Sequence, residues 1–167
     1  NRYIKSDLSM DNLLIPAIVV GAVILVALLF LIIRYKKLGL LSAISYIGYI
    51  ALFMILIRYA NVVLTIEGIF GIGIAIVINY IVLVYILNNL RKIEKNIVEY
   101  KKEYNNSILS VILVLVPSII IGIVLCFSTW LPAYSFGTVI FWGILLIGIY
   151  NAVVTRFLLL NSINNKK

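Results

Sequence analysis

The chain has 167 residues, of which 64% are hydrophobic and only 12% are charged. Soluble domains are roughly 45–50% apolar and about 25% charged, so the composition excludes an ordinary soluble domain and predicts an integral membrane protein. The net charge of +8 does not indicate nucleic-acid binding, because the basic residues lie in short runs between apolar segments, as in the loops of membrane proteins. With no histidine and one cysteine, we expect neither a metal site nor histidine-based catalysis, and we predict no cofactor and no enzymatic activity.

Five stretches are apolar over about 20 residues, the length that an α-helix needs to cross a bilayer. Many of their residues are β-branched, which in water would favour strands. Within lipid, every backbone polar group must be satisfied inside the segment, and this requirement favours helices. We therefore predict an all-α, polytopic membrane bundle with transmembrane helices at residues 13–33, 38–57, 68–90, 108–131 and 136–160.

The distribution of basic residues predicts the orientation. Of the 14 Lys and Arg residues, Arg2, Lys5 and Arg58 lie on one side, and the others lie in the first and third links and near the C-terminus. Cytoplasmic loops are enriched in Lys and Arg, so we expect a multi-pass protein of a bacterial cell membrane with its N-terminus outside and its C-terminus inside. We then expect residues 1–12 to be an extracytoplasmic lead-in at the end of a larger domain, and residues 161–167 to be a cytoplasmic tail.

The third link, residues 91–106, has an amphipathic pattern. Ile93, Ile97, Tyr100 and Tyr104 recur at helical spacing, with Lys and Glu between them. This pattern predicts a short helix that lies on the cytoplasmic face of the membrane. A solvated charged loop is the alternative.

Two amides, Asn79 and Asn151, lie deep in the third and fifth stretches. An amide at that depth has no water to bond, so each should face protein rather than lipid. Two interpretations remain open, a transport site and an interhelical hydrogen bond. Such a bond averages only about 0.6 kcal/mol, and it is a sufficient explanation.

Small residues on the same two stretches predict close helix packing. Gly71 with Ala75, and Gly148 with Ala152, are spaced four apart, which lets helix backbones approach each other in lipid. We expect the third and fifth spans to form the tight centre of the bundle. The predicted packing residues are Gly68, Gly71, Gly73, Ala75, Gly148 and Ala152.

Two stretches resemble the SecD protein-export family of the RND superfamily. The sequence LTIEGIFGIGIAIVIN, residues 64–79, is similar to the family segment that begins Leu-Thr-Leu-Pro-Gly and continues to Asp-Ala-Asn. The sequence SFGTVIFWGILLIGIYNAVVTRFLLL, residues 135–160, looks like the last span of that family, with its Val-Thr-Arg motif at Val154, Thr155 and Arg156. The resemblance extends over about residues 21–160 and implies the fold of one half of an RND-type transporter.

The resemblance implies an accessory subunit of the Sec machinery that assists preprotein translocation beside a SecF-like half and the SecYEG channel. Asn79 matches the Asn of the family motif, but Val77 stands where the family has a proton-responsive Asp. The resemblance therefore carries over the scaffold and not the ionisable group, so proton coupling is not expected from this chain. Two alternatives are an RND-type exporter of lipid or small hydrophobic molecules and a structural scaffold subunit of a larger membrane complex.

Overall fold

A computed structural model of the protein describes residues 10–93 and 96–164. All regular secondary structure in these ranges is helical, and five segments are long and apolar enough to cross a membrane. The predicted all-α membrane bundle with five spans is confirmed. The segments are α1 (Met10–Tyr35), α2 (Lys37–Tyr59), α3 (Ile66–Arg91), α4 (Ile97–Cys126) and a composite last span made of α5 (Leu131–Tyr150), the π-helical turn η1 (Asn151–Thr155) and α6 (Arg156–Asn164).

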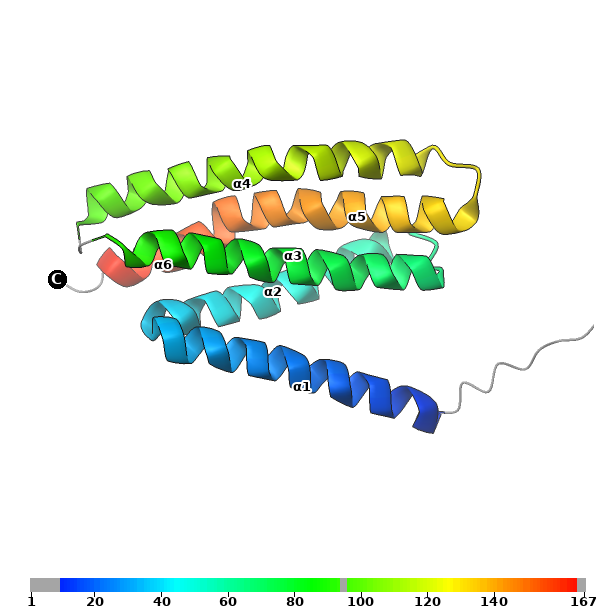
Figure 1. Ribbon diagram of the computed structural model, residues 1–167, viewed down its shortest axis with the longest axis horizontal. Coiled ribbons are helices and arrows are strands. Elements are labelled where there is room, and N and C mark those ends of the chain that lie inside the picture. Colours follow the sequence, from blue (N-terminus) through cyan, green and yellow to red (C-terminus); the bar gives the residue numbers. More distant parts are fainter. Residues whose placement is uncertain (1–9, 94–95, 165–167) are drawn as a thin grey trace, which may run out of the picture.

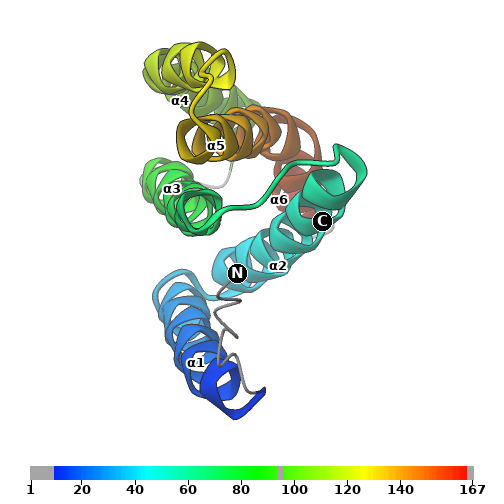
Figure 2. The ribbon, with the colours of Figure 1, turned by 90° about the vertical axis from the view of Figure 1, so that its right-hand side faces the viewer.

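The helices run along one long axis and alternate in direction (Figure 1). α5 is central, because it packs against α3, α4 and α2. α1 lies at the edge and packs mainly on α2, as the end-on view in Figure 2 shows. Most apolar side chains of α1 are exposed on the outside of the bundle, as expected for a surface that contacts acyl chains.

The structure differs from the prediction over the link at residues 91–106. The fourth helix begins just after Asn96, whose side chain accepts a hydrogen bond from a backbone N–H of the first turn, and it continues unbroken through the span. Tyr100 and Tyr104 are only 4% and 0% exposed, and they belong to the same buried cluster as Ile108. The prediction of a separate helix on the membrane surface was therefore wrong. Because burial of the two rings is favourable, the fourth helix begins before the purely apolar stretch that starts at residue 108.

The boundary between the last two spans also differs. The fourth span was expected to reach residue 131, yet α4 ends at Cys126 and α5 has already begun at Leu131. Pro132 lies in the first turn of α5. Proline lacks a backbone donor, which the first turn of a helix does not need, so this position favours a helix start.

The segment that joins α2 to α3 is tied to the start of α5. The Ser135 hydroxyl donates to the carbonyl of Val63 at 2.6 Å and accepts from the backbone N–H of Thr65 at 3.1 Å. The Thr65 hydroxyl in turn accepts from the N–H of Gly68 at 3.4 Å and caps α3. These bonds position α3 against α5 at this end of the bundle.

Candidate functional site

Small residues bring α3 and α5 into close contact along a line that we call the α3–α5 seam. A Cβ atom added at Gly71 would lie 3.1 Å from Cγ1 of Val139. One turn further along, a Cβ atom added at Gly143 would lie 2.7 Å from Cβ of Ala75. The predicted small pair on the third span therefore lies against the fifth, and Gly143 supplies the matching small residue.

The other predicted packing residues differ in their surroundings. Gly68 lies against the Ser135 hydroxyl at the start of the α3–α5 seam. Nothing lies within 4 Å of a Cβ atom added at Gly73 or Gly148, so the helix contact expected at Gly148 with Ala152 is not formed at the glycine. Gly143 and Asn151 contact α3 and, with Ile147 between them at intervals of four residues, form the row that faces that helix. Gly148 is one residue past Ile147, a rotation of about 100° around the helix. Ala152 is half-buried.

The two deep amides meet at the end of the α3–α5 seam. Asn79 and Asn151 are each 1% exposed. The Nδ2 group of Asn151 donates to Oδ1 of Asn79 at 2.9 Å and to the carbonyl of Ile147 at 2.9 Å. The interhelical hydrogen bond that the sequence suggested is therefore present, and the other interpretation, a transport site, remains a hypothesis.

Hydroxyl groups extend the amide pair to α2. The Thr155 hydroxyl donates to Oδ1 of Asn151 at 3.0 Å, and Oγ of Ser45 lies 2.5 Å from Oγ1 of Thr155. A hydroxyl has one proton to donate, and that of Thr155 is already directed at Asn151. Ser45 is consequently the donor, and the bonds run in one direction from α2 through η1 to α3.

The backbone of Asn151 receives a further bond from α4. The Tyr104 hydroxyl donates to the Asn151 carbonyl at 2.5 Å, at the start of the π-helical turn η1. Single π-helical turns are frequent at functional sites because they alter the helical hydrogen-bond ladder. Groups from α2, α3, α4 and η1 thus meet in one place. We call this set the polar cluster, and its members are Ser45, Asn79, Tyr104, Asn151 and Thr155, none more than 1% exposed.

The chemistry of the polar cluster is limited to hydrogen bonding. It contains amides and hydroxyls, and none of its side chains is a carboxylate, an amine or a thiol. Nδ2 of Asn79 is buried and has no hydrogen-bond partner among the described residues. The other side-chain donors of the polar cluster are already bonded, so this atom is the donor that the cluster retains for another polar group. Leaving a buried donor unsatisfied costs about 1–3 kcal/mol.

The residues matched to the SecD motifs do not all reach the polar cluster. Thr155 belongs to it, whereas Val77 is 57% exposed. Val77 precedes Asn79 by two residues, a rotation of about 200°, so it faces out of the bundle. Arg156 is half-buried and lines a separate pocket.

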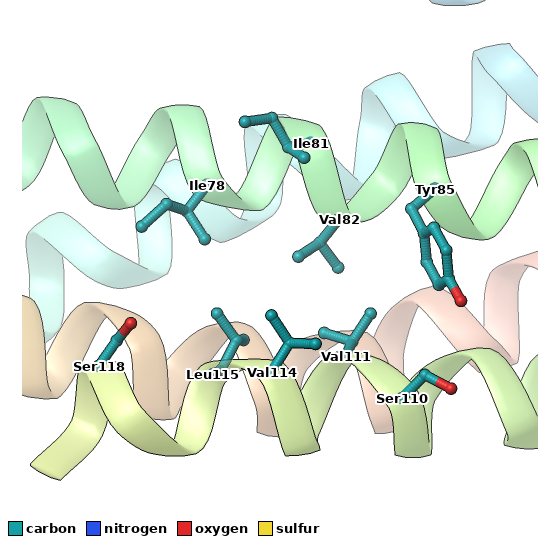
Figure 3. A pocket seen from close by; sticks show the side chains of 9 residues that line it. All are labelled: Ile78, Ile81, Val82, Tyr85, Ser110, Val111, Val114, Leu115 and Ser118. Carbon is teal, nitrogen blue, oxygen red and sulfur yellow. The ribbon is translucent and has the colours of Figure 1, made fainter.

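An apolar groove lies between α3 and α4, with a volume of about 440 Å³. Figure 3 shows side chains of both helices directed toward each other across it, with the hydroxyls of Tyr85, Ser110 and Ser118 along its length. The remaining lining residues are Ile78, Ile81, Val82, Val111, Val114 and Leu115. This groove could not be predicted from the apolar pattern of the two spans, because the pattern does not specify how they pack.

Two members of the polar cluster, Ser45 and Tyr104, were also missed as partners of the amides. A signal for Ser45 is present in α2, where Ser42, Ser45 and Tyr49 follow at intervals of three and four residues and form one polar stripe on an apolar helix. Tyr49 donates to the carbonyl of Gly143 at 3.1 Å. The stripe therefore marks the face of α2 that turns toward α5.

No protein-family model matches the chain, and neither a curated protein nor a solved structure matches it. The likeness to SecD therefore rests on the two stretches quoted above.

Proposed function

We propose that the protein is an accessory membrane subunit of the Sec protein-export machinery, similar to the transmembrane half of SecD, and that it assists preprotein translocation. The proposed location is the cell membrane of a bacterium, with the N-terminus outside and the C-terminus in the cytoplasm. The proposed partners are a SecF-like half and the SecYEG channel.

One observation carries the proposal. The two stretches that resemble SecD, residues 64–79 and 135–160, lie far apart in the sequence and pack against each other at the centre of the bundle. Asn79 from the first stretch and Thr155 from the second both bond to Asn151. The packing of these two stretches, with motif residues of both in one hydrogen-bonded cluster, fits the scaffold that the resemblance implies.

The outward face of α3 supports the inclusion of a partner half. Phe70, Val77 and Ile81 are 69%, 57% and 60% exposed, and Gly73 between them has open space around it. In lipid, a small residue flanked by apolar side chains permits close approach by another helix.

The experiment is site-specific photo-crosslinking in cells, combined with depletion of the protein. A photoreactive residue at Val77 should capture the SecF-like half or the Sec channel, identified by mass spectrometry. The same residue at Val20, which is 58% exposed on α1, is the matched control. Depletion should cause unprocessed preproteins to accumulate. Normal export after depletion, with crosslinks only to an unrelated complex, would refute the proposal and favour a scaffold subunit.

The groove between α3 and α4 favours a second candidate, an RND-type exporter of lipid or small hydrophobic molecules. Its lining is mostly isoleucine, valine and leucine, which suits an acyl chain. Val114 is 74% exposed in the groove, and Leu113 is 64% exposed beside it without lining it. If this candidate is right, Val114→Trp will slow the movement of a fluorescent phospholipid in proteoliposomes and Leu113→Trp will not. Absence of such movement in the wild type excludes it.

A further inference from the structure

A second pocket lies where the first turns of α4 approach η1 and α6, at the end of the bundle that holds the C-terminal helix (Figure 1). We call it the α4–α6 pocket. Its volume is about 830 Å³. Lys101 enters it from α4 and Arg156 from α6, so two cationic side chains from different helices line one cavity.

No acidic group among the described lining residues balances this charge. The nearest acids along α4 are Glu99 and Glu103, each two residues from Lys101. Two residues correspond to a rotation of about 200°, so both carboxylates lie on the other side of the helix. The described lining of the pocket, with Lys101 and Arg156, therefore complements an anion.

The walls of the α4–α6 pocket are apolar and exposed. Val153 and Phe157 are 62% and 67% exposed, and Ile97 is 37% exposed on the facing helix. Beyond these residues, the lining changes to the amides Asn161 and Asn164. A change from apolar to polar side chains along one helix is expected where that helix leaves the hydrocarbon and enters the interface. Asn161 follows Arg156 by five residues, about 7.5 Å along the helix, a distance that a long cationic side chain can cover to place its charged end at headgroup depth.

We propose that the α4–α6 pocket binds an anionic phospholipid from the leaflet on this side of the membrane. The phosphate lies between Lys101 and Arg156, and an acyl chain lies along Val153 and Phe157. Basic pockets between transmembrane helices bind anionic headgroups, and the planar guanidinium of arginine suits the two oxygens of a phosphate. This inference requires only that the bundle spans a membrane, so it stands or falls independently of the proposed role in export.

The test is lipid binding to the purified full chain in detergent, followed by native mass spectrometry. Phosphatidylglycerol should remain bound to the wild type, and phosphatidylcholine should bind weakly. Each cation near a headgroup is worth about a fivefold change in affinity, so the Lys101→Gln and Arg156→Gln double variant should bind phosphatidylglycerol about thirtyfold more weakly. The side chains of both residues lie outside the core, and circular dichroism will verify that the variant is folded.

The matched control is a double variant with Lys92→Gln and Lys102→Gln. These two lysines are exposed at the same end of the bundle and do not line the α4–α6 pocket. Its affinity should change by less than twofold. Equal losses in the two double variants would indicate general attraction to a basic surface and would overturn the proposed site. Glycerol phosphate that competes as well as the lipid would also overturn it, because the apolar walls would then contribute nothing.

Discussion

At the scale of single residues, Asn151 bonds to more groups than any other member of the polar cluster. Its amide donates to Asn79 and Ile147 and accepts from Thr155, while its carbonyl accepts from Tyr104. Asn79 takes part in only one of these bonds, and its Nδ2 group has no partner among the described residues. The two amides, equivalent in the sequence, are therefore unequal in the structure.

This inequality predicts unequal effects of alanine substitution. Asn151→Ala leaves buried groups on Asn79 and Thr155 without their partner and should lower the free energy of unfolding by about 1–2 kcal/mol. Asn79→Ala takes the acceptor from one N–H of Asn151 but also removes the unpaired Nδ2 of Asn79, so the net cost should be only about 0.6 kcal/mol. Unfolding in mixed detergent micelles measures both, with the exposed Asn105→Ala as the control. Equal losses at the two amides would contradict the assigned geometry.

Lys36, in the turn between α1 and α2, provides a second prediction at this scale. Its φ of 54° and ψ of −120° lie in a region that glycine occupies readily and other residues rarely adopt. Lys36→Gly should therefore stabilise the protein by about 1 kcal/mol. Lys37→Gly is the control, because Lys37 is the first helical residue of α2 and gains nothing from glycine. Thermal unfolding of the two variants measures the effect. A lower melting temperature for Lys36→Gly than for the wild type would show that the turn is not strained.

At the scale of helices, the α3–α5 seam is held by residues too small to separate the two backbones. Gly71→Leu would force its side chain into Val139, whereas Gly73→Leu on the same helix would enter open space. Overpacking costs about 1–3 kcal/mol or more, so Gly71→Leu should lower the yield of folded protein and Gly73→Leu should not. Size-exclusion chromatography with thermal unfolding measures both. Equal tolerance would show that the helices do not meet at Gly71.

The sequence was sufficient to predict the spans because a bilayer imposes one length and one type of structure on every apolar stretch. It was insufficient for Tyr100 and Tyr104, because an amphipathic helix on the membrane and the half-buried start of a span have the same periodicity. Gly148 shows a second limit. A four-residue interval identifies one face of a helix, but only the partner helix determines whether that face is covered, and here it is not.

At the scale of the whole molecule, orientation in the membrane can be tested directly. We predict that the loop between α3 and α4 and the first turns of α4 are cytoplasmic, because Lys and Arg are concentrated on this side. Cys126 is the only cysteine, so a Cys126→Ala background leaves single introduced thiols. Cysteine at Lys102 should react with an impermeant reagent only in opened cells, and cysteine at Arg58 should react in intact cells. Labelling of Lys102→Cys in intact cells would reverse the topology.

The whole bundle also determines whether the protein by itself carries protons, and we predict that it does not. A relay across the bilayer needs groups that titrate at depth, usually Asp, Glu or His. Glu67 is exposed in the first turn of α3, Glu99 and Glu103 lie near the start of α4, and the position matched to the family carboxylate is Val77, which faces outward. The polar cluster offers no substitute, because its amides interrupt the series of hydroxyls and a tyrosine hydroxyl ordinarily titrates only near pH 10.

The measurement uses residues 1–167 in liposomes that contain a pH-sensitive dye, under an imposed proton gradient. The flux should equal that of empty liposomes. It should stay equal after Asn79→Asp, because none of the other members of the polar cluster titrates near neutral pH and could take up the proton of a carboxyl group there. Val77→Asp, on the face of α3 that we assign to a partner half, should likewise be silent in the isolated protein. Proton flux in the wild type that disappears in Asn79→Leu would demonstrate a relay through the polar cluster and contradict the prediction.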